Sequence, residues 1–89
     1  MIVEFDKSFS KSLDKLTDTK ILARIEKVIL KLEQFETLDQ VSNSKKLIGF
    51  STYYRIKIGD YRLGFEKINE KKVRIIVVLH RKDIYKKFP

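Results

Sequence analysis

The chain contains no cysteine, and this absence excludes a disulfide framework, a thiolate metal site and a cysteine nucleophile. It has one histidine, so a cluster of imidazoles around a metal ion is excluded as well. The glycine-rich nucleotide loops and the HExxH pattern of zinc proteases are also missing. A Ser-His-Asp triad has the residue types it needs but no supporting motif. The sequence therefore predicts neither a metal nor a cofactor.

Long hydrophobic runs are missing too. No stretch approaches the ~18 apolar residues that a membrane-spanning helix needs, and acidic residues occur too early in residues 1–9 for a signal peptide. Together with the lack of cysteine, this composition predicts a cytoplasmic protein that is not associated with a membrane. The chain has 89 residues, 43% of them hydrophobic, which suits one small folded domain over residues 1–89 rather than a disordered chain.

Positive charge is what the chain has in excess, and it is unevenly spread. The net charge is +8. Residues 1–44 carry seven Lys and Arg against eight Asp and Glu, whereas residues 45–89 carry thirteen against four. The excess therefore lies in the C-terminal half. Such an asymmetry is typical of a protein that binds a nucleic acid or an acidic partner, although a lysine-rich surface can also serve solubility alone.

Hydrophobic periodicity predicts two helices in the first half of the chain. Apolar residues recur at helical spacing over 9–16 and again over 21–35. Ser8 is the expected N-cap of the first helix, and the polar residues 17–18 separate the two. Because this connection is short, the helices are expected to form an αα-hairpin. A short apolar run at 2–5 predicts a strand before them.

The second half has the pattern of strands, which we expect at about 52–58, 61–68 and 72–80. The apolar run 75–79 predicts a strand that is buried on both faces and central in its sheet. The turn near Asn69 leaves the register of this last strand open. A polar loop is expected over 37–44, a short strand or extended segment over 45–50 and one helical turn over 83–88. This order predicts an α+β fold, in which an N-terminal strand and an αα-hairpin pack on a small, mainly antiparallel sheet.

Three cations are predicted to share one face of this sheet. Pairing two strands across the Gly59-Asp60 turn places Lys57 opposite Arg62, and Arg55 lies on the same face because side chains alternate along a strand. Like charges opposite one another destabilise a sheet, so either solvent screens them or they are held for an anion. The sequence leaves both alternatives open. A lysine crowded by another cation is also a candidate general base.

His80 and Arg81 lie where the last strand ends, a place where functional sites tend to be built. His80 can exchange protons near neutral pH or simply pack. Arg81 can stabilise negative charge that develops on a phosphate. Tyr85 can stack on a base or pack the C-terminal turn onto the sheet. Further substrate-binding residues are expected to be Tyr53, which shares the cationic face, and the lysines Lys45, Lys46 and Lys82.

Three segments together resemble the RelE branch of the RelE/ParE superfamily of type II toxin–antitoxin toxins. They are Tyr54–Ile58 (YRIKI), Gly59–Leu63 (GDYRL) and His80–Tyr85 (HRKDIY). The resemblance covers nearly the whole chain and implies the RelE-like microbial RNase fold. It implies a metal-independent endoribonuclease, an mRNA interferase that cuts messenger RNA in the ribosomal A site and so inhibits translation. The implied partners are the ribosome, its message and a cognate acidic antitoxin, with a monomeric free toxin and a hetero-oligomeric complex.

The resemblance also implies roles for individual residues in an attack of the ribose 2′-OH on the adjacent phosphate. Lys57 matches the proposed base for the 2′-OH, and Arg62 matches the arginine that grips the scissile phosphate. Arg81 matches the arginine that assists the leaving oxygen, and Tyr85 the aromatic residue that stacks on the nucleotide. His80 matches a position that is histidine in many members of the family, which implies a role as proton donor. The implied catalytic set is Arg55, Lys57, Arg62, His80, Arg81 and Tyr85, in which Arg55 fills a basic position that is often lysine.

Two other functions remain open. The ParE branch shares the fold and inhibits DNA gyrase without any RNase chemistry. A degenerate member of the superfamily would bind RNA or an antitoxin without cutting. The RelE branch is favoured by the combined presence of Lys57, Arg62, Arg81 and Tyr85.

Overall fold

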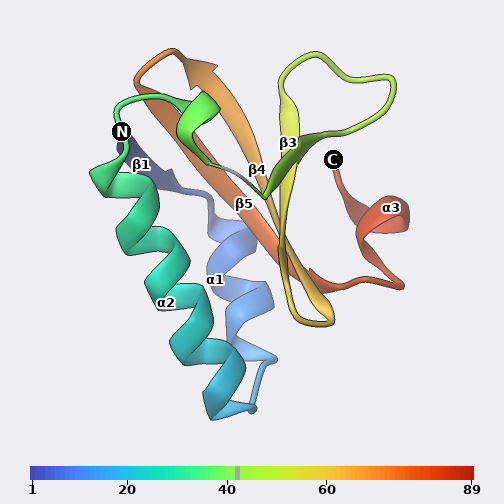
Figure 1. The fold of residues 1–89 in the computed structure, drawn as a ribbon. Coiled ribbons are helices and arrows are strands. Elements are labelled where there is room, and N and C mark those ends of the chain that lie inside the picture. Colours follow the sequence, from blue (N-terminus) through green and yellow to red (C-terminus); the bar gives the residue numbers. More distant parts are fainter. Residues whose placement is uncertain (42) are drawn as a thin grey trace.

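Five strands form one sheet in the part of the chain that the computed structural model describes, residues 1–41 and 43–89. Their order across the sheet is β1-β5-β4-β3-β2 (Figure 1). β1 (Ile2–Phe5) runs parallel to β5 (Lys72–His80). β4 (Tyr61–Asn69), β3 (Tyr53–Ile58) and β2 (Ser44–Lys46) continue the sheet as antiparallel neighbours. The predicted N-terminal strand and mainly antiparallel sheet are confirmed.

Two helices cover one face of the sheet, and a third, much shorter helix lies against the other face (Figure 1). α1 (Lys7–Asp14) and α2 (Thr19–Gln34) form the predicted αα-hairpin, and α3 (Ile84–Lys87) is the predicted C-terminal turn. This arrangement confirms the α+β class. None of the helices within residues 1–41 and 43–89 is long and apolar enough to cross a membrane.

The N-cap of α1 is Asp6, so the prediction of Ser8 as the cap was wrong. Asp6 has an extended backbone, and its carboxylate accepts a hydrogen bond from the Ser8 backbone N–H at 3.0 Å. This bond satisfies one of the N–H groups that have no partner in the first turn of a helix. The helix therefore begins two residues earlier than predicted, at Lys7, and Ser8 lies inside it.

Ser8 and Ser12 of α1 form hydrogen bonds with the backbone of β5 instead. β1 pairs with β5 only as far as Ile75, and beyond that point two backbone groups of β5 need other partners. The Ser8 hydroxyl donates to the Ile76 carbonyl at 2.7 Å, and the Ser12 hydroxyl accepts from the Val78 N–H at 3.0 Å. Two serines one helical turn apart thus tie α1 to the sheet.

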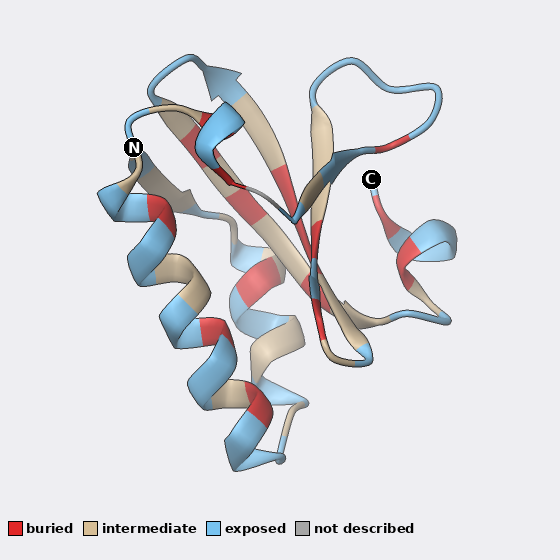
Figure 2. Ribbon diagram, viewed as in Figure 1, coloured by how far each residue is buried: buried red, intermediate tan, exposed pale blue. Residues whose placement is uncertain are grey.

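The main core fills the space between the αα-hairpin and the sheet (Figure 2). Phe9 of α1 and Ile25 and Leu32 of α2 are buried there. The sheet contributes Ile56, Ile58, Leu63, Phe65, Val73, Ile75 and Val78. Burial of this apolar area is the main contribution that holds the hairpin against the sheet.

A second, smaller core lies under α3 on the opposite face of the sheet. Its buried residues are Leu47, Ile84 and Phe88. β5 reaches this core as well as the main core, because Val77 packs here while Val78 packs against the hairpin. The prediction that this strand is buried on both faces is confirmed. It is an interior strand, but β4 rather than β5 occupies the centre of the sheet.

The segment 37–44, predicted as a polar loop, contains a short helix and two buried apolar side chains. A short 3₁₀ helix, η1 (Leu38–Gln40), buries Leu38, and Val41 is buried after it. Residue 42 of this predicted loop lies outside the described residues. The expectation of a strand over 45–50 is met only at its start, because β2 ends at Lys46 and Gly49 adopts a positive φ of 85°.

Candidate nucleic-acid interface

The three predicted cations lie on the face of the sheet that carries α3. Lys57 pairs with Arg62 across the β3–β4 hairpin, and Arg55 pairs with Gly64. Ile56 and Ile58 of the same strand are buried in the main core. Side chains alternate along a strand, so the cations point away from the αα-hairpin. We call Arg55, Lys57 and Arg62 the cationic trio.

Gly64 lets α3 approach this face closely. A Cβ atom at Gly64 would lie 2.9 Å from two carbons of the Phe88 ring, which is closer than such atoms approach in proteins. The ring of Phe88 therefore occupies the space that a side chain opposite Arg55 would otherwise take. As a result the C-terminal segment rests directly on the sheet beside the trio.

This docking brings Tyr85 to the trio. The Tyr85 side chain is 66% exposed, and the guanidinium carbon of Arg55 lies 5.9 Å from the centroid of its ring. The distance is that of a cation–π contact. An exposed ring held in this way is a platform on which an unstacked base can lie.

Arg62 is held by the turn that joins β3 and β4. Its Nη1 atom donates to the carbonyl oxygens of Gly59 and Tyr61, both at 2.9 Å. Gly59 has a φ of 59°, a conformation that favours glycine, and its carbonyl faces the arginine. A guanidinium has five N–H donors, so others remain for an anion. The arrangement orients one arginine without neutralising it.

Arg81 follows β5 at the same end of the sheet. Its backbone N–H donates to the Asp60 carbonyl at 2.8 Å, which ties the end of β5 to the β3–β4 turn. The Arg81 side chain is exposed. The structure thus collects Arg62 and Arg81 around one turn.

His80 lies on the other side of the sheet. It pairs with Tyr61, and the two rings meet edge to face with centroids 5.5 Å apart. Tyr61 packs against the main core, so both rings are on the side of the αα-hairpin. The His80 Nδ1 atom accepts the backbone N–H of Lys82 at 3.2 Å. The structure therefore separates His80 from the cationic trio.

The four predicted substrate-binding residues do not all lie on the face of the cationic trio. Lys45 pairs with Arg55 and extends the trio across β2. Lys46 pairs with Tyr54, and its Nζ atom lies 5.8 Å from that ring, on the side of the main core. Tyr53 is on the α3 side but packs edge to face with Phe88 at 5.5 Å, so it is part of the second core. Lys82 is exposed after β5.

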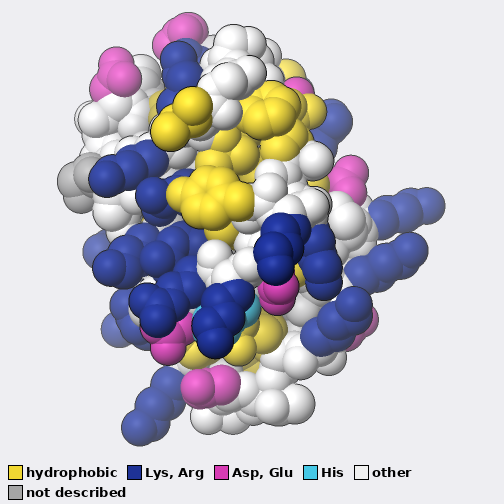
Figure 3. Space-filling view, turned by 90° about the vertical axis from the view of Figure 1, so that its right-hand side faces the viewer, with side chains coloured by type: hydrophobic (Ala, Val, Ile, Leu, Met, Phe, Trp, Pro, Cys, Tyr) yellow, Lys and Arg dark blue, Asp and Glu magenta, His cyan; other side chains and the backbone are white. Residues whose placement is uncertain are grey.

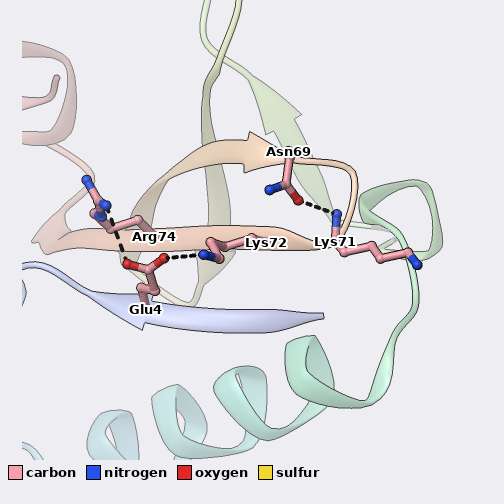
Figure 4. A network of polar contacts seen from close by, with 5 residues as sticks. All are labelled: Glu4, Asn69, Lys71, Lys72 and Arg74. Carbon is pink, nitrogen blue, oxygen red and sulfur yellow. Dashed lines mark hydrogen bonds and ion pairs between the residues drawn. The ribbon is translucent and has the colours of Figure 1, made fainter.

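The cations of this face are not paired with acids. Within residues 1–41 and 43–89, the ion pairs join Lys67 to Glu70 and both Lys72 and Arg74 to Glu4. All of these pairs involve the end of the sheet away from the β3–β4 turn, where Glu4 lies between its two partners (Figure 4). The hydrogen bond from Lys72 is the largest cause that lowers the pKa of Glu4. Charge is thus compensated at one end of the sheet and left free at the other.

Figure 3 shows the α3 side of the molecule, where Lys and Arg side chains surround a patch of hydrophobic side chains. Sequence reasoning found the cations but missed the apolar residues that dock α3, namely Leu47, Ile84 and Phe88. Their spacing gives no periodic signal over so short a helix. No group of three or more His, Asp or Glu side chains that could hold a metal ion occurs in the described part of the chain.

Comparison with known proteins identifies the class to which this basic α+β chain belongs. A family model described as the ParE toxin of the type II toxin-antitoxin system, parDE, matches residues 3–85. The protein is therefore a toxin of the type II toxin–antitoxin class.

Relatives with known names agree with this class. Toxin RelE3 from Methanocaldococcus jannaschii is 39% identical over 90 residues that cover 100% of each chain. The toxin of the RelB-RelE antitoxin-toxin complex from Methanococcus jannaschii superposes with a TM-score of 0.78 at 36% identity, over 97% of this chain and 99% of that chain. The intact E. coli RelBE complex gives a TM-score of 0.65 at 29% identity, over 86% and 92% of the two chains. The chain belongs to the RelE/ParE family of toxins, and the resemblance indicated by its three segments is confirmed.

Proposed function

We propose that the protein is a ribosome-dependent endoribonuclease that cuts messenger RNA in the ribosomal A site and so inhibits translation. The observation that carries this proposal is the meeting of the cationic trio with Tyr85. Four side chains from β3, β4 and α3 offer a phosphate-binding group and a stacking ring side by side, and the cations of this group have no acidic partner within residues 1–41 and 43–89. A phosphate and an unstacked base are the two parts of a nucleotide that such a site recognises.

The proposed reaction is attack of a ribose 2′-OH on the adjacent phosphate. The Lys57 amine accepts the proton of the 2′-OH, the new O–P bond closes a 2′,3′-cyclic phosphate, and the bond to the 5′-oxygen breaks. Arg62 and Arg55 hold the phosphate oxygens, and Arg81 stabilises the leaving oxygen until water supplies its proton. Tyr85 holds the base. No step needs a metal ion.

His80 takes a different part in this proposal from the one that the sequence suggested. Its ring packs on Tyr61 on the hairpin side of the sheet, and its Nδ1 atom accepts from the backbone just after Arg81. We assign it a positioning role, in which it holds the segment that carries Arg81. The proton donor of the earlier hypothesis is then replaced by water.

The ribosome is expected to supply what this site lacks. The Lys57 side chain is exposed, and the trio contains no carboxylate and no second base. Correct placement of the 2′-OH in line with the leaving oxygen must therefore come from outside the protein, since positioning alone accounts for a large part of such rate enhancements. We expect naked RNA to be cut poorly.

An acidic antitoxin is the proposed protein partner. The structures of relatives from Methanococcus jannaschii and E. coli are complexes of a RelE toxin with a RelB antitoxin. Residues 45–89 of this chain carry thirteen Lys and Arg against four Asp and Glu, which favours an acidic partner. Such a partner would neutralise the basic face or displace the segment that carries Tyr85.

Cell-free translation tests the proposed activity directly. The purified chain is added to a translating extract, and breaks in the message are mapped by primer extension, with Arg81→Ala as the matched variant. We expect breaks at A-site positions that disappear with Arg81→Ala, while the variant still binds its antitoxin. Intact message at normal translation rates would contradict the proposal. Loss of antitoxin binding in the variant would instead point to misfolding.

Inhibition of DNA gyrase is the second candidate function. It is favoured by one observation, the match of residues 3–85 to the family model described as the ParE toxin. A supercoiling assay with purified gyrase separates the two candidates, because gyrase inhibition requires neither ribosomes nor the cationic trio. A degenerate toxin would be inactive in both assays and would not stop growth when it is expressed alone.

A further inference from the structure

A row of cations runs along one flank of α2, outside the site described above. We call it the α2 strip, and it consists of Lys20, Arg24, Lys27 and Lys31. At ~3.6 residues per turn, spacings of four, three and four residues place these side chains within an arc of about 60°. The acidic residues of α2, Glu26 and Glu33, fall on a different side of the helix by the same geometry. The helix therefore has one flank that is purely cationic.

This flank faces the edge of the sheet next to the cationic trio. Arg24, Lys27 and Lys31 line one hollow together with Lys57 and Asn43. The hollow thus joins α2 to β3, the strand that carries two members of the trio. Lys57 lines the hollow although its side chain is on the face opposite the hairpin, so it lies at the boundary between the two surfaces.

A second connection runs over the β3–β4 turn. The Arg24 Nη1 atom lies 2.9 Å from the position that a Cβ atom of Gly59 would occupy. Arg62 donates to the carbonyl of the same glycine from the other side of the sheet, at 2.9 Å. Two guanidinium groups from opposite faces of the sheet therefore meet at Gly59, where the absence of a side chain leaves room for Arg24.

The α2 strip has no acidic partner among residues 1–41 and 43–89, where ion pairs involve only Lys67, Lys72 and Arg74. Like charges three and four residues apart destabilise a helix, and a bound anion would remove this cost. The row extends over eleven residue steps, or roughly 16 Å along the helix. This length accommodates several successive phosphates.

We propose that the α2 strip binds the phosphodiester backbone of the RNA strand that flanks the nucleotide held by the trio. The strand would pass from Arg62 over Gly59 and then along α2. RNA is chosen as the ligand on the basis of the proposed function. The strip itself favours phosphates over a protein partner, because protein interfaces are built around apolar and aromatic anchors, whereas a groove that tracks a backbone needs point charges.

Two triple variants with the same loss of charge test the proposal. The strip variant is Arg24→Gln, Lys27→Gln, Lys31→Gln. The control is Lys7→Gln, Lys11→Gln, Lys15→Gln, which removes an equivalent row near α1, a helix that packs on β5 rather than β3. Glutamine is a good helix former, so both variants should fold, and circular dichroism checks this.

The measurement is binding to a single-stranded RNA oligonucleotide made of 2′-O-methyl nucleotides, titrated at several salt concentrations. Each phosphate contact on a single strand contributes about 0.7 to the slope of log affinity against log salt, so loss of three contacts should lower the slope by about 2. Between about 50 and 200 mM salt, the wild type should then lose about 18-fold more affinity than the strip variant. The control variant should keep the wild-type slope.

Three results would overturn the proposal. Equal slopes for the strip and control variants would show that net charge alone matters. An unchanged slope in the strip variant would show that α2 does not contact the strand. Unchanged RNA binding with weakened antitoxin binding would assign the strip to the protein partner instead.

The test is independent of cleavage. A 2′-O-methyl strand keeps its phosphates but has no hydroxyl to attack, so binding is measured without the reaction. If the slope changes as expected while the translation assay shows no breaks, the α2 strip stands and the proposed nuclease function fails. If breaks occur while the slope is unchanged, the nuclease function stands and the proposed role of the α2 strip fails.

Discussion

At the scale of single residues, the site works by orienting cations without neutralising them. The two hydrogen bonds of Arg62 go to backbone carbonyls, which are dipoles rather than charges. Arg55 is held by the face of the Tyr85 ring. Each arginine keeps its full charge and several free donors. A carboxylate in either place would hold the side chain more firmly but would compete with the phosphate.

Lys57 allows a residue-scale test that separates base from charge. Lys57→Arg keeps the positive charge, but a guanidinium does not give up its proton in a protein. If Lys57 is the base, both Lys57→Arg and Lys57→Ala should slow ribosome-dependent cleavage by roughly 10²–10⁴-fold. Single-turnover cleavage of a programmed ribosome measures this.

The outcome for the arginine variant is decisive. A Lys57→Arg protein that cuts at the wild-type rate, beside an inactive Lys57→Ala protein, would reduce the role of Lys57 to phosphate binding. The β3–β4 register should survive both changes, because Lys57 is exposed and its neighbours Ile56 and Ile58 hold the strand in the main core.

At the scale of elements, α3 is the part that completes the site, and it is held by a core of its own. Ile84 and Phe88 are buried against the sheet, while Tyr85 between them faces solvent. The fit depends on Gly64, since the Phe88 ring occupies the space of the missing side chain. The element that presents the stacking ring can therefore be disturbed without any change to the αα-hairpin.

Gly64→Ala tests this dependence. The added methyl group would meet the Phe88 ring at 2.9 Å, and overpacking of this kind costs about 1–3 kcal/mol. For a chain of this length, each kcal/mol lowers Tm by about 4–8 °C. Thermal unfolding should show that decrease, and cleavage should fall because Tyr85 is displaced.

A second substitution serves as the control. Phe88→Leu in the Gly64→Ala background makes room for the methyl group and should recover part of the lost Tm. A Gly64→Ala protein that melts at the wild-type temperature would mean that α3 is not seated on the sheet as described.

The elements were more predictable from the sequence than their contacts. The hairpin register that creates the trio could be predicted because it depends on a local turn, Gly59-Asp60, and on alternation within two adjacent strands. The cap of α1 was misassigned because Asp6 and Ser8 are both good caps and only the three-dimensional path chooses between them. The docking of α3 and the position of His80 depend on contacts between distant segments, which periodicity does not encode.

At the scale of the whole molecule, the sheet is electrostatically divided. Glu4 joins β1 to β5 by contacts with Lys72 at 3.1 Å and Arg74 at 3.4 Å. The cations around the β3–β4 turn have no such contacts within the described residues. The compensated end holds the N-terminal strand in place, and the free end is available to an anion.

This division predicts how stability depends on pH. The hydrogen bond from Lys72 lowers the pKa of Glu4 in the folded protein, and that from the Ser8 side chain lowers the pKa of Asp6. A carboxyl whose folded pKa is depressed stabilises the protein above its unfolded pKa, about 4.3 for glutamate, and this contribution is lost as pH falls through the folded pKa. Urea unfolding should therefore show decreasing stability on acidification.

The substitution Glu4→Gln isolates the part of this pH dependence that comes from the ion pairs between β1 and β5. The difference in unfolding free energy between wild type and variant should be present at about pH 7 and should shrink as pH falls through the lowered pKa of Glu4 in the folded protein. A difference that does not change with pH would mean that Glu4 acts through packing alone.

The irregular pairing of β5 with β4 has a consequence for the choice of chemistry at the site. Phe65 faces Ile75, but Gly64 faces Val77, so Ile76 is one residue too many for its partner strand. Each residue of β5 after Ile76 therefore points to the opposite face of the sheet from the one it would take in a regular strand. In an uninterrupted strand, His80 would point to the face of the cationic trio. With the inserted residue, His80 instead pairs with Tyr61 on the side of the hairpin. One extra residue, roughly a dozen ångströms upstream, thus keeps the imidazole away from the trio.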